Sequence, residues 1–163
     1  MKKIITTLFF LVPVLTSLAQ TKCNIKKAYA FYTISVPGVQ MADENGNPIP
    51  PKADITRFIY IEWIGTTKPK IETVLYNNKA LAAKLTAVEG RTVVPGSELS
   101  PNNVSKITVK KGNSLWKVEL QPVSGNPMPE PDCKNIIIKN KGTGKACLFK
   151  LIKETQLMMM PRY

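Results

Sequence analysis

The sequence predicts an all-β domain, and three observations carry this prediction. Several short runs are rich in Ile, Val, Thr, Tyr and Phe, the residue types that favour strands. These runs end at turn residues, and 13 prolines and 9 glycines are spread along the chain. No segment after residue 20 shows the 3.6-residue apolar repeat of an amphipathic helix. An antiparallel two-sheet sandwich of about eight or nine strands fits this pattern, and a small up-and-down barrel is the alternative.

The first expected strand is Ile25–Val36, which carries apolar side chains on both faces. We therefore expect a central strand that is covered on both sides. A polar loop over residues 39–54 follows, and its sequence Asp43-Glu44-Asn45-Gly46-Asn47-Pro48 predicts a turn, because Gly accepts a positive φ and Asn tolerates it. A calcium loop is disfavoured, since prolines stand where the closing ligand would lie.

The middle of the chain predicts a meander of strands joined by turns. Tight turns are expected at Asn77-Asn78-Lys79 and Glu89-Gly90. A hairpin is expected next, with its turn at Lys111-Gly112-Asn113-Ser114. The strands predicted here cover residues 55–64, 71–76, 80–88, 91–94, 104–110 and 115–120.

The last part of the chain predicts a crossover and a final hairpin. Residues 121–132 contain four prolines, which exclude regular structure and indicate a segment that crosses or edges the domain. Strands over 135–140 and 146–153 should then pair around Lys141-Gly142-Thr143-Gly144. Methionines 158–160 near the end are interpreted as core filler or a docking surface.

One expected strand offers a candidate binding surface. Ile59, Ile61 and Trp63 alternate on the more uniformly apolar face, which we assign to the core. Phe58 and Tyr60 lie on the opposite face, where they would form an aromatic platform for a sugar ring or a partner chain. The alternative is that both faces of this strand are covered.

Residues 1–19 predict a cleavable signal peptide. Lys2 and Lys3 precede a short apolar run over 4–15, and small residues Ser17 and Ala19 stand at the cleavage positions. The run is shorter than the roughly 20 residues of a membrane anchor, so residues 20–163 form one exported domain without a transmembrane segment. The ending Ser-Leu-Ala-Gln resembles the signal peptides of many small exported proteins of Bacteroidota. That resemblance implies a periplasmic, cell-surface or secreted location and no activity.

The three cysteines predict one disulfide and one unpaired thiol in an oxidising compartment. Cys133 and Cys147 flank the final hairpin and are the preferred pair. Cys23 is then the unpaired thiol, near the mature N-terminus, where it would be able to join a second chain. A Cys23–Cys133 bond is the alternative, if the first strand lies beside the last hairpin.

The chain contains no histidine, which excludes Ser-His-Asp and Cys-His catalysis and His-ligated zinc. We expect no cofactor and no metal, because the cysteines also lack a C-x-x-C pair. Paired carboxylates would be the remaining catalytic route, and Glu62 and Glu72 are the candidates. Strand alternation in an expected hairpin would place them on opposite faces or in direct repulsion. A histidine-free hydrolase is therefore the disfavoured alternative, and we expect no enzyme.

The formal net charge is +12, and removal of Lys2 and Lys3 with the signal peptide leaves about +10. Such a charge favours anionic partners. Arginine makes most bidentate base contacts, and only three are present, so we expect no specific nucleic-acid binding. The leading hypothesis is a non-enzymatic envelope domain that binds an envelope glycan, an acidic lipid or another envelope protein, or has a structural role. A protein that associates with polyanions through diffuse lysine charge is the alternative.

Overall fold

The computed structural model describes residues 23–36, 41–49, 53–97, 104–123, 125–141 and 147–158. The expected signal peptide lies outside these residues. The described part of the chain is all-β, as predicted, and contains no helix. Its strands are β1 (Ile25–Ser35), β2 (Met41–Ala42), β3 (Pro48–Ile49), β4 (Asp54–Ile64), β5 (Ile71–Tyr76), β6 (Lys79–Val88), β7 (Thr92–Ser97), β8 (Val104–Thr108), β9 (Asn113–Pro122), β10 (Ile136–Asn140), β11 (Cys147–Leu151) and β12 (Glu154–Gln156).

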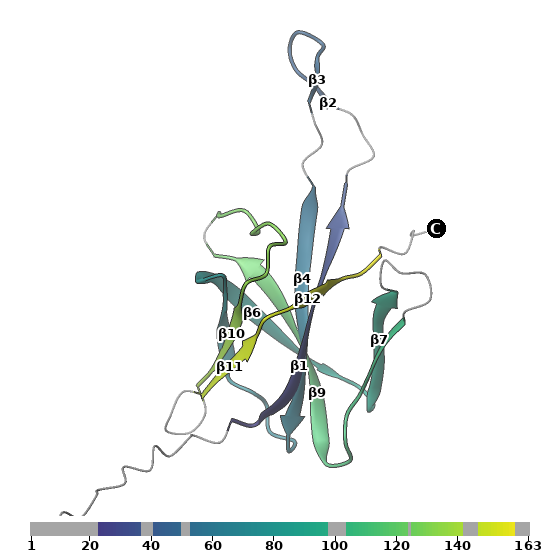
Figure 1. Ribbon diagram of the computed structural model, residues 1–163, viewed down its shortest axis with the longest axis vertical. Coiled ribbons are helices and arrows are strands. Elements are labelled where there is room, and N and C mark those ends of the chain that lie inside the picture. The colour runs from purple at the N-terminus through teal and green to yellow at the C-terminus, as the bar shows by residue number, and fades with distance from the viewer. Residues whose placement is uncertain are drawn as a thin grey trace, which may run out of the picture.

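Eight strands form one mixed sheet in the order β11-β10-β5-β6-β9-β4-β1-β12, and this sheet is nearly closed into a barrel (Figure 1). The prediction of a two-sheet sandwich is therefore wrong. The core lies inside one curved sheet, because the last strands return to the first strand instead of forming a second layer. The connections also differ from those of an up-and-down barrel, since β4 pairs with β1 and β9 but not with β5.

Two expected hairpins are confirmed, whereas the predicted meander is wrong at its other two connections, because β4 does not pair with β5 and β6 does not pair with β7. The turn between β5 and β6 consists of Asn77 and Asn78, whose φ angles are 45° and 67°; positive φ at both positions suits the twist of a two-residue hairpin. β10 pairs with β11 as expected, although residues 142–146 of their connection lie outside the described part. The hairpin expected between residues 104–110 and 115–120 is wrong, because β8 pairs with β7.

The expected turn at Asp43–Asn47 is confirmed and joins the short strands β2 and β3. The Asp43 carboxylate accepts hydrogen bonds from the backbone N–H groups of Asn45 and Asn47, at 2.9 and 2.8 Å. The Asn47 side chain lowers the pKa of Asp43 by donating a further hydrogen bond to it. This carboxylate is thus occupied within its own turn, at the end of a projecting hairpin (Figure 1).

The seam of the barrel lies between β1 and the β11–β12 segment. β12 pairs with β1 in parallel, so that Ala30 lies opposite Glu154. A disulfide joins Cys23, which precedes β1, to Cys147, the first residue of β11. The Cys23–Cys147 bond and the Ala30–Glu154 pair have the same sequence separation of 124. No ladder pair joins the intervening residues 24–29 to 148–153 in the described structure.

Apolar side chains are buried on both sides of part of the sheet. Inside the barrel, β4 contributes Ile59, Ile61 and Trp63, which confirms that this face of the strand is core. The outer side of β1, β4 and β9 packs against the β7–β8 hairpin through a second apolar cluster. The prediction that β1 is covered on both sides is accordingly confirmed, since Ala30 belongs to the first cluster and Phe31 to the second.

Candidate functional site

A buried ion pair lies inside the barrel. The Arg57 side chain projects from β4 and is 1% exposed, and the Glu154 side chain projects from β12 and is 4% exposed. Arg57 Nε donates to Glu154 Oε2 at 3.0 Å and Nη2 donates to Oε1 at 3.4 Å. The contact is thus bidentate, which is the strongest arrangement of an arginine with a carboxylate. It joins β4 to the strand that closes the seam.

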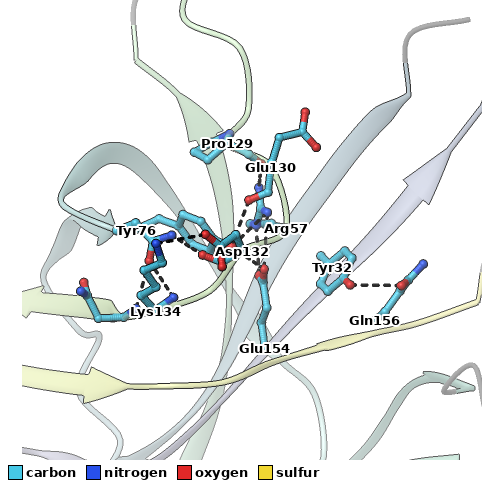
Figure 2. A network of polar contacts seen from close by, with 11 residues as sticks. Tyr32, Arg57, Tyr76, Pro129, Glu130, Asp132, Lys134, Glu154 and Gln156 are labelled. Carbon is cyan, nitrogen blue, oxygen red and sulfur yellow. Dashed lines mark hydrogen bonds and ion pairs between the residues drawn. The ribbon is translucent and has the colours of Figure 1, made fainter.

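Tyr76 of β5 completes the arrangement (Figure 2). Its hydroxyl donates to Glu154 Oε1 at 2.6 Å and accepts a hydrogen bond from Arg57 Nη2 at 3.3 Å. The Arg57 guanidinium also lies 4.2 Å from the centre of the Tyr76 ring. Burial raises the pKa of Tyr76, and the hydrogen bond to Glu154 raises it further. Tyr76 is therefore a neutral donor at physiological pH.

The proline-rich crossover covers this ion pair. Arg57 Nη1 donates to the carbonyl oxygen of Pro129 at 2.5 Å, and the carbonyl oxygen of Glu130 lies 3.2 Å from the Tyr76 hydroxyl. Proline has no N–H, so a segment of this composition offers mainly acceptors, which arginine, as a pure donor, can satisfy. The expected irregular crossover is confirmed after Pro122, whereas Gln121 and Pro122, predicted as irregular, are the last residues of β9. The ion pair anchors the crossover to the barrel.

Asn77 fixes the exit of the same crossover. Its side-chain oxygen accepts hydrogen bonds from the backbone N–H groups of Lys134 and Asn135, at 2.8 and 3.0 Å, and its side-chain amide donates to the Asp132 carbonyl. The adjacent residues Tyr76 and Asn77 thus bind the crossover at two places, at Glu130 and at residues 132–135. Together, these contacts connect β4, β5, β12 and the crossover. We interpret them as a structural clasp, since burial keeps Arg57 and Glu154 from solvent.

The sequence analysis did not identify Arg57, Tyr76 or Glu154. A signal for Arg57 was present, because residues 57, 59, 61 and 63 share one face of the expected strand and three of them were assigned to the core. An arginine in phase with core residues requires a buried partner. Glu154 carries no comparable signal, since it lies in a tail with no predicted strand.

The cysteine assignment is corrected by the structure. Cys23, expected as the unpaired thiol, is bonded to Cys147, and Cys133 is the free cysteine. The Cys133–Cys147 pair and the alternative Cys23–Cys133 pair are both wrong. The first strand does lie beside the last hairpin, as the alternative required, but this places Cys23 next to Cys147 and not next to Cys133. Burial raises the pKa of Cys133, and the nearby Glu154 carboxylate acts in the same direction. This thiol is therefore poorly suited to nucleophilic chemistry.

Phe58 and Tyr60 do not form an exposed platform. They are 9% and 7% exposed, and they pack with Phe31 beneath the β7–β8 hairpin. The expectation of an aromatic binding surface is thus wrong, and the alternative that both faces are covered holds. Its physical reason is the second apolar cluster, to which the hairpin contributes Val93 and Ile107. Neither ring is available to stack on a ligand.

The two glutamates considered for hydrolysis lie in different environments. Glu62 is 2% exposed and accepts hydrogen bonds from the Lys110 backbone N–H at 3.3 Å and from Asn113 Nδ2 at 2.5 Å. Glu72 is exposed and pairs with Lys141 at 2.7 Å, which lowers the pKa of Glu72. The two residues lie on β4 and β5, which do not pair. Each carboxylate has separate partners, so the structure does not bring them together.

A groove lies on the surface along the seam. It has a volume of about 400 Å³ and is lined by residues 28–31 of β1, Ser105 of β8, residues 150–153 and Thr155. The charged residues of this lining are Lys150 and Lys153, and no acidic residue contributes to it. Neither lysine lies within ion-pair distance of a carboxylate among the described residues. The groove therefore has the charge and apolar walls to receive an anion.

Lysine charge is also unbalanced over the remaining described surface. Among the described lysines, Lys117, Lys134 and Lys141 are the ones that pair with a carboxylate. No three His, Cys, Asp or Glu side chains gather as a metal site within the described residues. The same part of the chain contains no helix long and apolar enough to span a membrane. No protein-family model, curated protein or solved structure matches this chain.

Proposed function

We propose that this protein is an exported, non-enzymatic module that binds an anionic partner at the cell envelope. The observation that carries the proposal is the groove at the seam, where Lys150 and Lys153 stand without carboxylate partners beside apolar walls. Lysine charge of this kind attracts anions without specifying their geometry. The Cys23–Cys147 disulfide fits an oxidising compartment.

Four engaged glutamates, including the two considered for hydrolysis, support a binding role over a hydrolytic one. Glu62 and Glu154 are buried and bonded to fixed donors, and Glu72 and Glu119 are bonded to lysines. A general acid or base needs a free carboxyl group within reach of its substrate. Most described lysines, by contrast, form no ion pair with a carboxylate and are available to an anion.

The test is retention of the oxidised mature chain on heparin at increasing salt concentration. We expect retention at about 0.05 M salt and elution well below 1 M, because the Debye length falls to about 3 Å at 1 M. A neutral dextran column should not retain the protein. Passage through heparin at low salt without delay would contradict the proposal.

A further inference from the structure

Two large apolar side chains are exposed on β11 and on the residue that directly follows it. Leu148 is 64% exposed and Ile152 is 73% exposed, which makes them the most exposed large hydrophobic residues in the described part of the chain. They alternate with the exposed Lys150, while Cys147, Phe149 and Leu151 face inward. Scattered single apolar residues are normal on protein surfaces. Leu148 of β11 and Ile152, which directly follows this strand, form a patterned surface with the lysine between them.

The neighbouring strand extends the same pattern. Ile137 of β10 lies opposite Lys150, and Lys139 lies opposite Leu148. Directly opposite residues of antiparallel strands project from the same face of a sheet. Together with Lys153, these residues make a mixed cationic and apolar surface, which we call the β11 face: Ile137, Lys139, Leu148, Lys150, Ile152 and Lys153.

The β11 face is not covered by any element that the structure describes. The β7–β8 hairpin covers the outer side of β1, β4 and β9 instead. The strands that contact β11 are β10 and β1, both within its own sheet. Figure 1 shows β11 on the near side of the barrel, away from β7. The two apolar side chains are therefore available to a partner.

The charge of the β11 face indicates the kind of partner that it fits. The face contains three lysines and no acidic residue. Glu154 follows Lys153 in the sequence but is buried and bonded to Arg57, and Glu72 on the nearby β5 is paired with Lys141. A heparin-like polyanion would engage the lysines and leave Leu148 and Ile152 in water. A surface with both anionic groups and acyl chains would engage all of them.

We propose that the β11 face docks on an anionic lipid surface, with Leu148 and Ile152 entering the boundary between head groups and acyl chains. Lysines near such a surface attract its anionic head groups, and bulky apolar side chains enter the layer below. The groove beside Lys150 and Lys153 has room for a head group. This inference rests on the proposed function and names its partner.

Sedimentation with lipid vesicles tests the inference. The oxidised mature chain is mixed with vesicles of phosphatidylcholine alone or with about one third phosphatidylglycerol, at 0.05 M salt, and the partition coefficient is measured. We expect binding to the anionic vesicles and at least tenfold weaker binding to the neutral ones. The double variant K150E/K153E should lose more than about twentyfold in partitioning, since each lysine contributes roughly a fivefold factor.

The apolar variant separates a lipid from any other polyanion. L148S/I152S should lose about tenfold in partitioning to anionic vesicles, because both side chains leave water on docking. The same variant should keep wild-type retention on heparin, which offers no acyl chains. Matched controls are V36S/V94S, which alters two other exposed apolar residues, and K68E/K111E, which reverses two other exposed lysines. The control V36S/V94S should partition to anionic vesicles like the wild type. The partition coefficient of K68E/K111E should fall less than that of K150E/K153E.

The outcomes distinguish the two proposals. If L148S/I152S partitions like the wild type while heparin retention persists, the lipid inference is overturned and the anion-binding function stands. If K150E/K153E behaves like K68E/K111E, the β11 face is not the site. If the wild-type chain binds neither heparin nor anionic vesicles, the function itself fails. Unchanged urea midpoints of the variants show that the fold is intact.

Discussion

Substitution of Glu154 with Gln removes the charge that balances Arg57 while keeping the size of the side chain. The carboxylate accepts hydrogen bonds from Arg57 Nε, Arg57 Nη2 and the Tyr76 hydroxyl. A glutamine has one acceptor oxygen for these three donors, and its amide group opposes a guanidinium. Breaking one side of a buried ion pair costs about 3–5 kcal/mol. We expect E154Q to lower the free energy of unfolding by about 3 kcal/mol, which shifts the urea midpoint by about 1.5 M at a slope near 2 kcal/mol/M.

Urea unfolding followed by the fluorescence of the core residues Trp63 and Trp116 measures this loss. The matched control is E72Q, which breaks an ion pair of 2.7 Å whose side chains are 67% and 70% exposed. That control should change stability by less than about 0.5 kcal/mol. The variant R57M/E154M, in which neither charge is left unpaired, should be more stable than E154Q. A loss in E154Q no larger than that in E72Q would refute the assignment of Arg57 and Glu154 as a clasp.

Three further predictions concern the seam, the outer cluster and the free thiol. C23A/C147A should lower the free energy of unfolding by about 4–5 kcal/mol by the chain-entropy model, because the bond spans 124 residues; equal urea midpoints of oxidised and reduced wild type would contradict this. F58A should lose about 3–5 kcal/mol because its ring is buried beneath the β7–β8 hairpin; a loss below about 1 kcal/mol would indicate an exposed ring. Burial raises the folded pKa of Cys133 above its ordinary value of 9.0, so the unfolded chain releases this proton first. The contribution of the neutral Cys133 thiol to folding stability is therefore complete below pH 9 and is lost as pH rises above 9. Between pH 9 and 10, the free energy of unfolding of C133A should fall less than that of the wild type. Equal falls in the two proteins would exclude a contribution from this thiol.

Strand positions were largely predictable from the sequence, whereas their pairing was not. Residue types and turn signals locate β1, β4, β5, β6, β9, β10 and β11, because these features act over a few residues. Pairing depends on contacts between distant segments. β4 has Asn113–Pro122 beside it instead of the next strand in the sequence, and no local pattern specifies this choice. The sandwich prediction failed for that reason.

The closing strand illustrates the same limit. β12 has only three residues, Glu154–Gln156, and no apolar alternation distinguishes them from an irregular tail. Its place beside β1 depends on Glu154 meeting Arg57 inside the barrel and on Leu157 packing in the outer cluster. The disulfide was missed because it lies on the same seam. Sequence spacing favoured the nearer cysteines 133 and 147, whereas the contact of β1 with β11 brings Cys23 to Cys147.

The seam also explains why the strongest interactions and the candidate docking surface lie on the same segment. The disulfide holds β11 at Cys147, and the Arg57–Glu154 ion pair holds β12, so both ends of this segment are fixed. Its inward side chains close the barrel, while Leu148, Lys150 and Ile152 project outward. A surface fixed in this way loses little conformational entropy on binding. Substitutions on the β11 face should therefore weaken binding to anionic vesicles at constant stability. E154Q should weaken both this binding and stability, because it releases the end of the segment that presents Lys153.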